Sequence, residues 1–445
     1  MARLGLRSAA GRKPLVLIAG GGVAALEALL ALQELAGDRI ALELVAPGRD
    51  FSYRPLAVGE PFGLGEARRY DLGAICSDQN ARLIQGVVEA VEPEHQRVWT
   101  ADGERRSYDA LVVAVGAKTS PWLDQAITVY GPGYTDRFSA TLEDLEQRRI
   151  RGVTFVVPAG GAWPLPVYEL ALMTARWVAE RGLEGVHVRL ITHEDRPLQL
   201  FGAAASDAVE RLLDEAQVAL DTSCAVVSME PDRLHVAPQG DVPLAADRVV
   251  TLAKLSGPSI PGLPGDGQGF IRVDAHGLVD GEEDVYAAGD ATTVPIKQGG
   301  IAAQQADAVA EAIAARAGAP VTPAPFRPVL RGMLLTGSTP RYLRAEVAGG
   351  RGEDREVSRH ALWWPPSKIE GRYLSPYLAR HHEAFDTRVE GAGALPVEIE
   401  LEQHSSERVR RRAVIQPRSA EGPNVLPLDD PGAWRRRVSC RSSTS

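Results

Sequence analysis

Cysteine is scarce in this chain. Cys76, Cys224 and Cys440 are the three among 445 residues, and no two are close in sequence. This spacing excludes a CxxC redox pair and a cysteine-based metal site. His193 and the pair at 381–382 lack a metal-binding context as well. We therefore predict free thiols in a reducing cytoplasm and no metal site.

Long apolar runs and an excess of positive charge are also lacking. No stretch reaches the roughly 18 apolar residues of a transmembrane helix, and the N-terminal MARLGLRSAAGRKP has no apolar signal-peptide core. With 49 Lys and Arg against 58 Asp and Glu, the net charge is −9. No basic footprint for nucleic acid is left. We predict a cytoplasmic protein, with peripheral contact at the inner face of a membrane as the alternative.

The most informative segment that is present is LVLIAGGGVAALEALLALQELA, residues 15–36. A continuous apolar run predicts a buried parallel strand, and an Ala/Leu-rich run predicts a helix. Between them, Gly20 permits a tight turn, Gly22 leaves room for a pyrophosphate, and Ala25 lets the helix pack close to the strand. Val23 and Ala24 open the helix, whose free N–H groups favour phosphate. This order predicts a dinucleotide-binding loop.

The acid that normally grips the adenosine ribose is not where it is expected. The second predicted strand, residues 40–45, runs into Ala46-Pro47. The nearest acids are Glu43 and Asp50, and neither stands at the strand end. The sequence leaves the ribose contact undefined.

Two further short apolar strands end in glycine. YDALVVAVGA at 108–117 ends at Val115-Gly116, and VYAAGDA at 285–291 ends at Gly289-Asp290. With the first loop, in this order, they resemble the three FAD signatures of the pyridine nucleotide-disulfide oxidoreductase superfamily over residues 14–325. The resemblance implies that Asp290 hydrogen-bonds the ribityl chain of FAD. The middle signature has valine at position 115 where the family has threonine.

The resemblance adds further cofactor-binding residues. Lys297, Gln298 and Gly299 precede a helix expected from about Ile301, whose N-terminus points at the flavin pyrimidine edge in the family. Lys297 would be the catalytic residue that adds positive charge there; the alternative is a solvated loop lysine.

Two other segments resemble cofactor contacts of the sulfide:quinone reductase and type II NADH dehydrogenase branches. FSYRPLAVGEP, residues 51–61, resembles a segment that lines FAD in these branches, which brings Arg54 and Pro55 near the cofactor. Residues 86–88, with Val87, resemble the segment whose backbone meets the adenine.

A second glycine loop is altered. After a predicted strand at 153–157 the chain reads PAGGAWPLPVYE, residues 158–169. Trp163 would fill pyrophosphate space, and Pro164 and Pro166 lack N–H donors. Glu169 keeps the position of a glutamate of the family. Downstream, Glu194 would suit a ribose and Arg196 a 2′-phosphate. The sequence therefore leaves NADH or NADPH binding open.

The resemblance implies an α/β fold with two Rossmann-like dinucleotide-binding domains and a small α+β C-terminal domain. The FAD domain is expected to be discontinuous, at 1–120 and 246–325, with the second, NAD-like domain inserted at 121–245. Helix-like runs stand at 166–182 and 203–217.

The last third is expected to form the C-terminal domain at 326–404, with strands at 329–335, 342–347 and 397–401. In the family such a domain covers the flavin or forms a dimer or quinone contact. Its apolar run Leu362–Ile369 predicts core packing, with a lid or membrane-facing patch as the alternative. Residues 405–445 are predicted to be a disordered basic tail.

These features predict an FAD-dependent oxidoreductase that passes two electrons through the flavin to a quinone or another small acceptor. It resembles sulfide:quinone reductases, but no cysteine lies near Gly116 or Asp290 or at 310–380 to carry sulfur. The alternatives are an NAD(P)H-dependent reductase and a flavin-binding sensor or scaffold without turnover.

Overall fold

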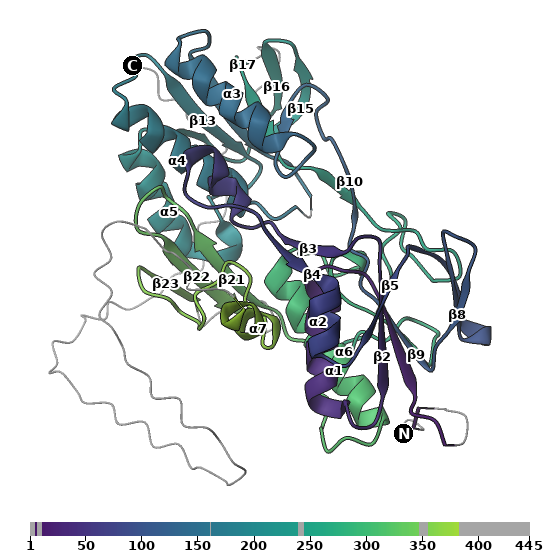
Figure 1. Cartoon of the computed structure of the whole chain (residues 1–445). Coiled ribbons are helices and arrows are strands. Elements are labelled where there is room, and N and C mark those ends of the chain that lie inside the picture. The colour runs from purple at the N-terminus through teal and green to yellow at the C-terminus, as the bar shows by residue number, and fades with distance from the viewer. Residues whose placement is uncertain (1–4, 7–10, 161, 239–243, 347–354, 382–445) are drawn as a thin grey trace, which may run out of the picture.

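The computed structural model describes residues 5–6, 11–160, 162–238, 244–346 and 355–381. The strand expected at 397–401, the tail at 405–445, Gly161 and Cys440 lie outside the described residues. Figure 1 shows two sheets with their helices, one at each end of the molecule, and a C-terminal unit alongside both.

The first sheet has five parallel strands in the order β20-β9-β1-β2-β5. They span Val285–Ala287, Ala110–Val113, Leu15–Ala19, Ala41–Ala46 and Arg82–Gln85. Side chains alternate between two cores: Val16 and Ile18 face α1 (Val23–Ala36) and α6 (Gly299–Arg316), and Leu17 and Ala19 face the other side. This two-faced burial explains why β1 is apolar throughout.

Short elements complete this end of the molecule. The antiparallel strands β6 (Val88–Glu92), β7 (Arg97–Thr100) and β8 (Arg105–Ser107) cover one sheet face, with η2 (Pro93–His95) between the first two. The hairpin of β3 (Asp50–Tyr53) and β4 (Arg68–Asp71) encloses η1 (Ala57–Phe62) and leads into α2 (Leu72–Asp78), while η4 (Gly289–Ala291) follows β20.

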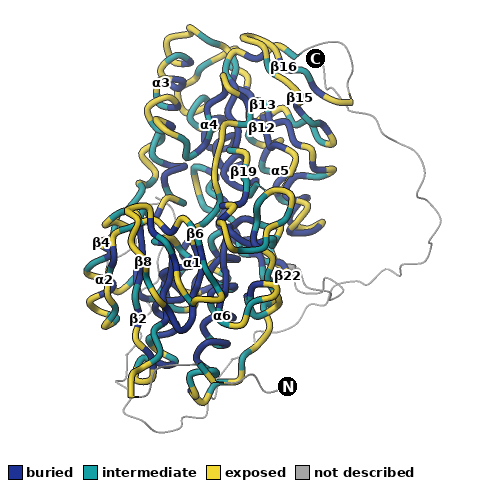
Figure 2. Tube along the Cα trace, turned by 90° about the vertical axis from the view of Figure 1, so that its right-hand side faces the viewer, coloured by how far each residue is buried: buried dark blue, intermediate teal, exposed yellow. Residues whose placement is uncertain are grey.

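The second sheet is also parallel, in the order β11-β18-β12-β13-β14. Its strands span Ile127–Thr128, Val249–Thr251, Gly152–Val157, His187–Thr192 and Ala219–Asp221. The helices α3 (Tyr134–Glu146), α4 (Leu165–Glu180) and α5 (Ala203–Glu215) belong to this end, with η3 (Gln199–Phe201) before α5. These helices cover one face of the sheet. On its other face, a separate core is formed with the antiparallel strands β15 (Ala225–Glu230), β16 (Arg233–Ala237) and β17 (Leu244–Ala245). Figure 2 shows buried residues along the strands β12 and β13.

The chain passes between the two sheets twice, through β10 (Lys118–Ser120) and β19 (Lys254–Ser256), which pair antiparallel. Because β20 and α6 follow the second crossing, the first sheet and its helices are built from chain segments that precede and follow the second sheet. The mixed α/β fold with parallel sheets follows the prediction; the division at 120, 245 and 325 stays a prediction.

The C-terminal unit packs on both cores. Its antiparallel strands are β21 (Val329–Leu334), β22 (Arg341–Glu346) and β23 (Arg355–Ser358), followed by α7 (Leu374–Arg380). Leu330 and Leu343 join the core of the second sheet, whereas Leu374 and Leu378 join the core around α1. The unit therefore bridges the two ends of the molecule.

The two adjacent tryptophans of the apolar run differ. Trp363 is buried and meets Tyr342 edge-on, with ring centroids 5.2 Å apart. Trp364 is 78% exposed. The predicted core packing thus applies to the first tryptophan and not to the second. None of the described helices has the length and apolar character needed to cross a bilayer.

Candidate functional site

A cavity of about 450 Å³ opens where the parallel strands of the first sheet end. Its walls follow β1, β2, β5, β9 and β20, which is the edge where open α/β sheets bind ligands. Ten predicted site residues line it: Gly20, Gly22, Val23, Ala24, Val87, Val115, Gly116, Gly289, Asp290 and Gly299. The topology thus brings together residues from positions 20 to 299 of the chain.

Gly20 and Gly22 differ in why a side chain is lacking at each position. Gly20 has a φ of +133°, and a Cβ there would lie 2.2 Å from the Ala114 carbonyl oxygen. A Cβ on Gly22 would meet nothing within 4 Å. Gly22 precedes α1 without a side-chain cap, so the first helical N–H groups remain free for a ligand.

Gly289 and Asp290 form a turn at the opposite wall of the cavity. Gly289 has a φ of +78°, and a Cβ there would lie 3.0 Å from the Ala24 side chain. Burial raises the pKa of Asp290, and the charge of Lys297 lowers it in part. Within the described residues, no protein group is seen to donate a hydrogen bond to this carboxyl. A hydroxyl of a bound ligand could donate the hydrogen bond that this carboxyl lacks.

Five predicted residues do not line the cavity: Ala25, Arg54, Pro55, Lys297 and Gln298. Ala25 is fully buried on the core-facing side of α1, which agrees with its predicted packing role. Arg54 is exposed in the segment after β3, and the Pro55 carbonyl accepts a hydrogen bond from Tyr130 at 3.4 Å.

Lys297 turns away from the cavity. Its Nζ donates to the Thr292 carbonyl and lies 3.9 Å from the centroid of the Phe270 ring. Burial lowers the pKa of Lys297 to about 8, against the opposing effect of Asp290 and Asp266. Direct contact between this ammonium and a group in the cavity is therefore not seen, but its charge stands beside Asp290.

Gln298 is occupied at the start of α6. Its Oε1 accepts the Ile301 N–H at 2.9 Å, and its Nε2 donates to the Arg331 carbonyl at 3.0 Å. The side chain acts as a helix cap. This cap also explains why the helix begins at Gly299 rather than at Ile301.

Gly86 and Val88 of the predicted adenine segment line the cavity as well. The sequence analysis missed the rest of the lining, which is mostly small and apolar: Gly21, Val45, Ala46, Pro47, Gly48, Asp50, Leu72, Ala114, Ala288 and Ala302. Asp50, set aside because it stands five residues beyond the strand, is the acid that reaches the cavity, whereas Glu43 lies 3.7 Å from Arg82. The turn at Pro47-Gly48 was the available signal.

An aromatic side chain and two prolines stand at the second glycine loop. Trp163 meets Phe201 edge-on, with ring centroids 5.7 Å apart. Pro164 is the N-cap of α4, and Pro166 lies in its first turn. Neither proline has an N–H, so this helix start lacks donors that a phosphate cradle uses.

The acid that the sequence analysis compared with a family glutamate has a protein partner. Glu169 is fully buried in α4, and the Lys368 Nζ lies 2.5 Å from its Oε1. The Leu335 N–H donates to the same carboxylate at 2.8 Å. Burial raises the pKa of Glu169 and lowers that of Lys368. The C-terminal unit thus closes over the start of α4.

The two side chains that would suit a nicotinamide nucleotide, those of Glu194 and Arg196, also have protein partners. Glu194 is buried and accepts hydrogen bonds from Tyr168 at 2.5 Å and Thr192 at 2.9 Å. Arg196 pairs with Glu210, 2.8 Å away, and with Asp207. A ribose or 2′-phosphate would have to displace these partners.

The described cysteines offer no redox site. Cys76 and Cys224 are buried and do not form disulfides, and neither lines the cavity. Burial raises the pKa of Cys76 to about 11, which disfavours the reactive thiolate. Among the described residues, no group of His, Cys, Asp and Glu is arranged to hold a metal ion.

Comparison with known proteins gives concordant results. Sulfide-quinone reductase of Aquifex aeolicus (strain VF5) is 25% identical over 232 residues, 49% of this chain and 53% of the relative. Putidaredoxin reductase CamA of Pseudomonas putida is 28% identical over 224 residues, 48% of this chain and 50% of the relative. The chain thus spans about half the length of these curated relatives.

A solved structure agrees over more of the chain. That of the Aquifex aeolicus sulfide:quinone oxidoreductase gives a TM-score of 0.69 at 20% identity, covering 78% of this chain and 86% of the other. This likeness shows the fold. The family model for pyridine nucleotide-disulphide oxidoreductases matches residues 14–312. The chain therefore belongs to this family of flavin-dependent oxidoreductases.

Proposed function

We propose that the cavity of the first sheet holds FAD and that the second sheet does not bind a nicotinamide nucleotide. The protein would pass two electrons through the flavin to a quinone or another small acceptor. The observation that carries this proposal is the contrast between the two glycine loops. The first is open at Gly22, whereas Trp163, Pro164 and Pro166 occupy the second.

The residues around the cavity fit FAD. The free N–H groups at the start of α1 suit its pyrophosphate. The Asp290 carboxyl, half-buried at the cavity wall, suits a ribityl hydroxyl. Val87, half exposed after β5, and Gly86 offer backbone near an adenine. When bound, FAD supplies two-electron redox chemistry that amino-acid side chains lack.

Lys297 would act on the cofactor through its charge. It stands beside Asp290 without lining the cavity, and its pKa of about 8 leaves it mostly protonated at neutral pH. A buried positive charge favours the more negative, reduced state of a neighbouring group. We therefore propose that Lys297 acts on the cofactor through its charge and without direct contact.

The NAD(P)H-dependent reductase remains the second candidate because the second parallel sheet is complete from β11 to β14. A nucleotide there would need Trp163 to leave Phe201, and Glu194 to leave Tyr168. These contacts favour the first candidate.

The acceptor can be tested directly. The purified protein is reduced anaerobically with dithionite, freed of excess reductant and mixed with a water-soluble short-chain quinone in a stopped-flow instrument. We expect the flavin absorbance near about 450 nm to return. Protein without bound FAD, or reduced flavin that the quinone leaves unoxidised, would contradict the proposal.

A further inference from the structure

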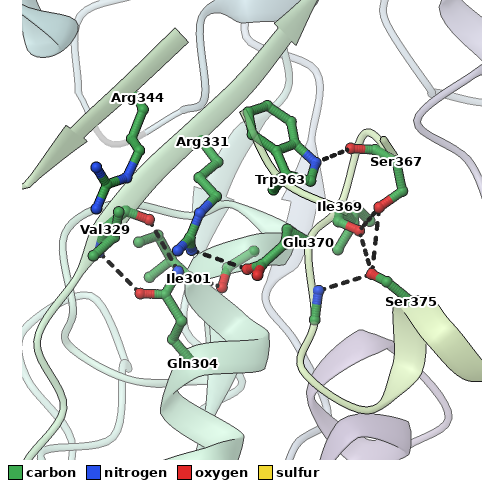
Figure 3. A network of polar contacts seen from close by, with 12 residues as sticks. Ile301, Gln304, Val329, Arg331, Arg344, Trp363, Ser367, Ile369, Glu370 and Ser375 are labelled. Atoms are coloured by element: carbon green, nitrogen blue, oxygen red, sulfur yellow. Dashed lines mark hydrogen bonds and ion pairs between the residues drawn. The ribbon is translucent and has the colours of Figure 1, made fainter. Parts of the chain in front are cut away.

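A short segment of the C-terminal unit crosses the two helices that flank the cofactor cavity. We name residues Ser367–Leu374 the strap. The Ile369 N–H donates to the Tyr53 hydroxyl at 3.1 Å, and Glu370 lies 2.9 Å from Arg331. Figure 3 shows the Glu370–Arg331 pair and the bonds that Ser367 and Ser375 make to the Ile369 carbonyl. The strap is thus tied to β3 at one end of the molecule, to the neighbouring strand β21, and through Lys368 to Glu169 of α4 at the other end.

Ile369 places the strap against the cavity wall. A Cβ built on Gly299 would lie 2.7 Å from the Ile369 side chain. Since Gly299 lines the cavity at the start of α6, Ile369 forms the layer directly behind that wall. Movement of the strap would change the support of this wall.

The far end of the strap is held by a buried glutamate in the middle of α1. Glu27 is fully buried. It accepts the Tyr373 N–H at 2.7 Å and the Leu374 N–H at 2.8 Å. A Cβ on Gly371 would come within 2.5 Å of Glu27 Oε2, so the strap approaches this carboxylate closely. The sequence analysis gave no role to Glu27.

Glu27 has a carboxyl neighbour, Asp307 of α6, that stands near enough to form a side-chain hydrogen bond with it. Two carboxylates repel, so such a bond requires that one of them carry a proton. Glu27 has two N–H donors to stabilise a charge, whereas Asp307 Oδ1 is buried without a hydrogen-bond partner among the described residues. The proton therefore belongs on Asp307, which donates it to Glu27.

We propose that Glu27 and Asp307 share one proton and together act as positioning residues, which hold the strap on α1 and α6 and thereby keep Ile369 behind Gly299. The link to catalysis rests on the proposed function, because it takes the cavity as the FAD site. The holding of the strap does not depend on FAD.

The charges around the pair fix the expected pH dependence. Glu370 of the strap and Glu311 of α6 favour protonation, and Arg372 of the strap opposes it. Burial raises the pKa of Glu27 to about 7 and of Asp307 to about 9. We call the strap closed when it is held on α1 and α6. If the pair binds the proton only in this closed state, the proton stabilises the closed state at low pH, and this stabilisation is lost as the pH rises through 7 to 9.

A second cavity gives this proton a route to solvent. It has a volume of about 370 Å³, and Asp307, Arg331, Glu370 and Arg372 are among its lining residues. Opening of the strap would expose the pair to this space. The open state would then release the shared proton.

The test is hydrogen exchange of the strap and α7 amides in the full-length, cofactor-loaded protein between pH 7 and 9, corrected for intrinsic exchange. If opening of the strap releases one proton, the equilibrium constant for opening should rise about tenfold for each pH unit. In Asp307→Asn the new amide donates to Glu27 without a titrating proton, so this slope should disappear while the strap stays protected. Glu27→Gln keeps an acceptor for the strap and should also flatten the slope.

Glu34→Gln is the matched control, because Glu34 is exposed on the same helix α1. Its slope should equal that of the wild type. A flat slope in the wild type, or an unchanged slope in both Asp307→Asn and Glu27→Gln, would overturn the proposal. A protein that binds no FAD would refute the proposed function, yet the strap slope would still decide this inference.

Discussion

At the scale of single residues, the cavity depends on two glycines with positive φ angles and on one carboxyl group for which no protein hydrogen-bond donor is seen in the described part of the chain. Gly20 and Gly289 adopt left-handed backbone angles with other atoms closely packed beside them. Asp290 is a carboxyl at the cavity wall without a seen protein donor in the described part of the chain. A ligand that brings hydroxyl groups would complete this site.

Asp290→Ala should weaken FAD binding. Loss of a hydrogen bond to a charged group costs about 1.5–3 kcal/mol, or roughly tenfold to a hundredfold in affinity. The measurement is FAD content per protein after purification, with Asp280→Ala, an exposed residue, as the control. Full occupancy in Asp290→Ala would remove this residue from the site.

Lys297→Met should lower the reduction potential of the flavin, because a positive charge near the reduced state is lost. A shift on the order of 30 mV corresponds to about 1.4 kcal/mol for two electrons. With the Lys297 pKa at about 8, the difference between wild type and variant should shrink as the pH rises above that value.

The potentials can be measured by equilibrium dye titration at pH 7 and pH 9.5. Lys254→Met, which alters an exposed lysine of β19, is the control. Equal potentials in wild type and Lys297→Met at pH 7 would contradict a role for Lys297.

At the scale of elements, the two glycine loops show what sequence patterns can and cannot predict. The strand–loop–helix order around Gly20 predicted the cavity, because the reasons for each residue are local: a tight turn, an open approach and close packing. The tryptophan and prolines after β12 marked the second loop as altered, but the sequence left NADH or NADPH binding there open. Helices α4 and α5 end only two residues before their expected limits.

Contacts across long sequence separations were not predictable. Glu169 meets Lys368, 199 residues away, and Glu27 meets the Leu374 N–H, 347 residues away. No local pattern marks such partners, because only the folded chain brings them together. The direction of the Lys297 side chain was not predictable for a related reason: its partners, Phe270 and the Thr292 carbonyl, are defined by packing.

Lys368→Met should destabilise the protein strongly, because Glu169 would keep a buried charge without its partner. Breaking a buried ion pair in this way costs about 3–5 kcal/mol. The double variant Glu169→Gln with Lys368→Met should recover much of that loss, since no buried charge remains.

Chemical denaturation followed by circular dichroism measures these free energies. Arg176→Met, which alters an exposed ion pair with Glu180 on the same helix α4, is the control and should change the stability by less than about 1 kcal/mol. A similar small change for Lys368→Met would show that the Glu169–Lys368 pair contributes little.

At the scale of the whole molecule, the C-terminal unit adds to the contacts between the two ends, which also meet through β10 with β19 and through η1 with α3 and α4. It contributes Leu374 to one core and Leu330 to the other, and Lys368 to Glu169 at the start of α4. The same unit therefore supports the proposed FAD cavity and contacts the helix that follows the second loop. This arrangement agrees with the proposal that the protein keeps both parallel sheets and uses one of them for a cofactor.

The central claim is tested most directly by anaerobic titration of the purified protein with NADH and, separately, NADPH. The readout is the oxidised flavin absorbance near about 450 nm, and dithionite serves as the control for full reduction. The filled loop at Trp163 predicts that neither nucleotide bleaches the flavin, while dithionite bleaches it completely. Rapid bleaching by NADH or NADPH would contradict the account and establish the second sheet as a working nucleotide site.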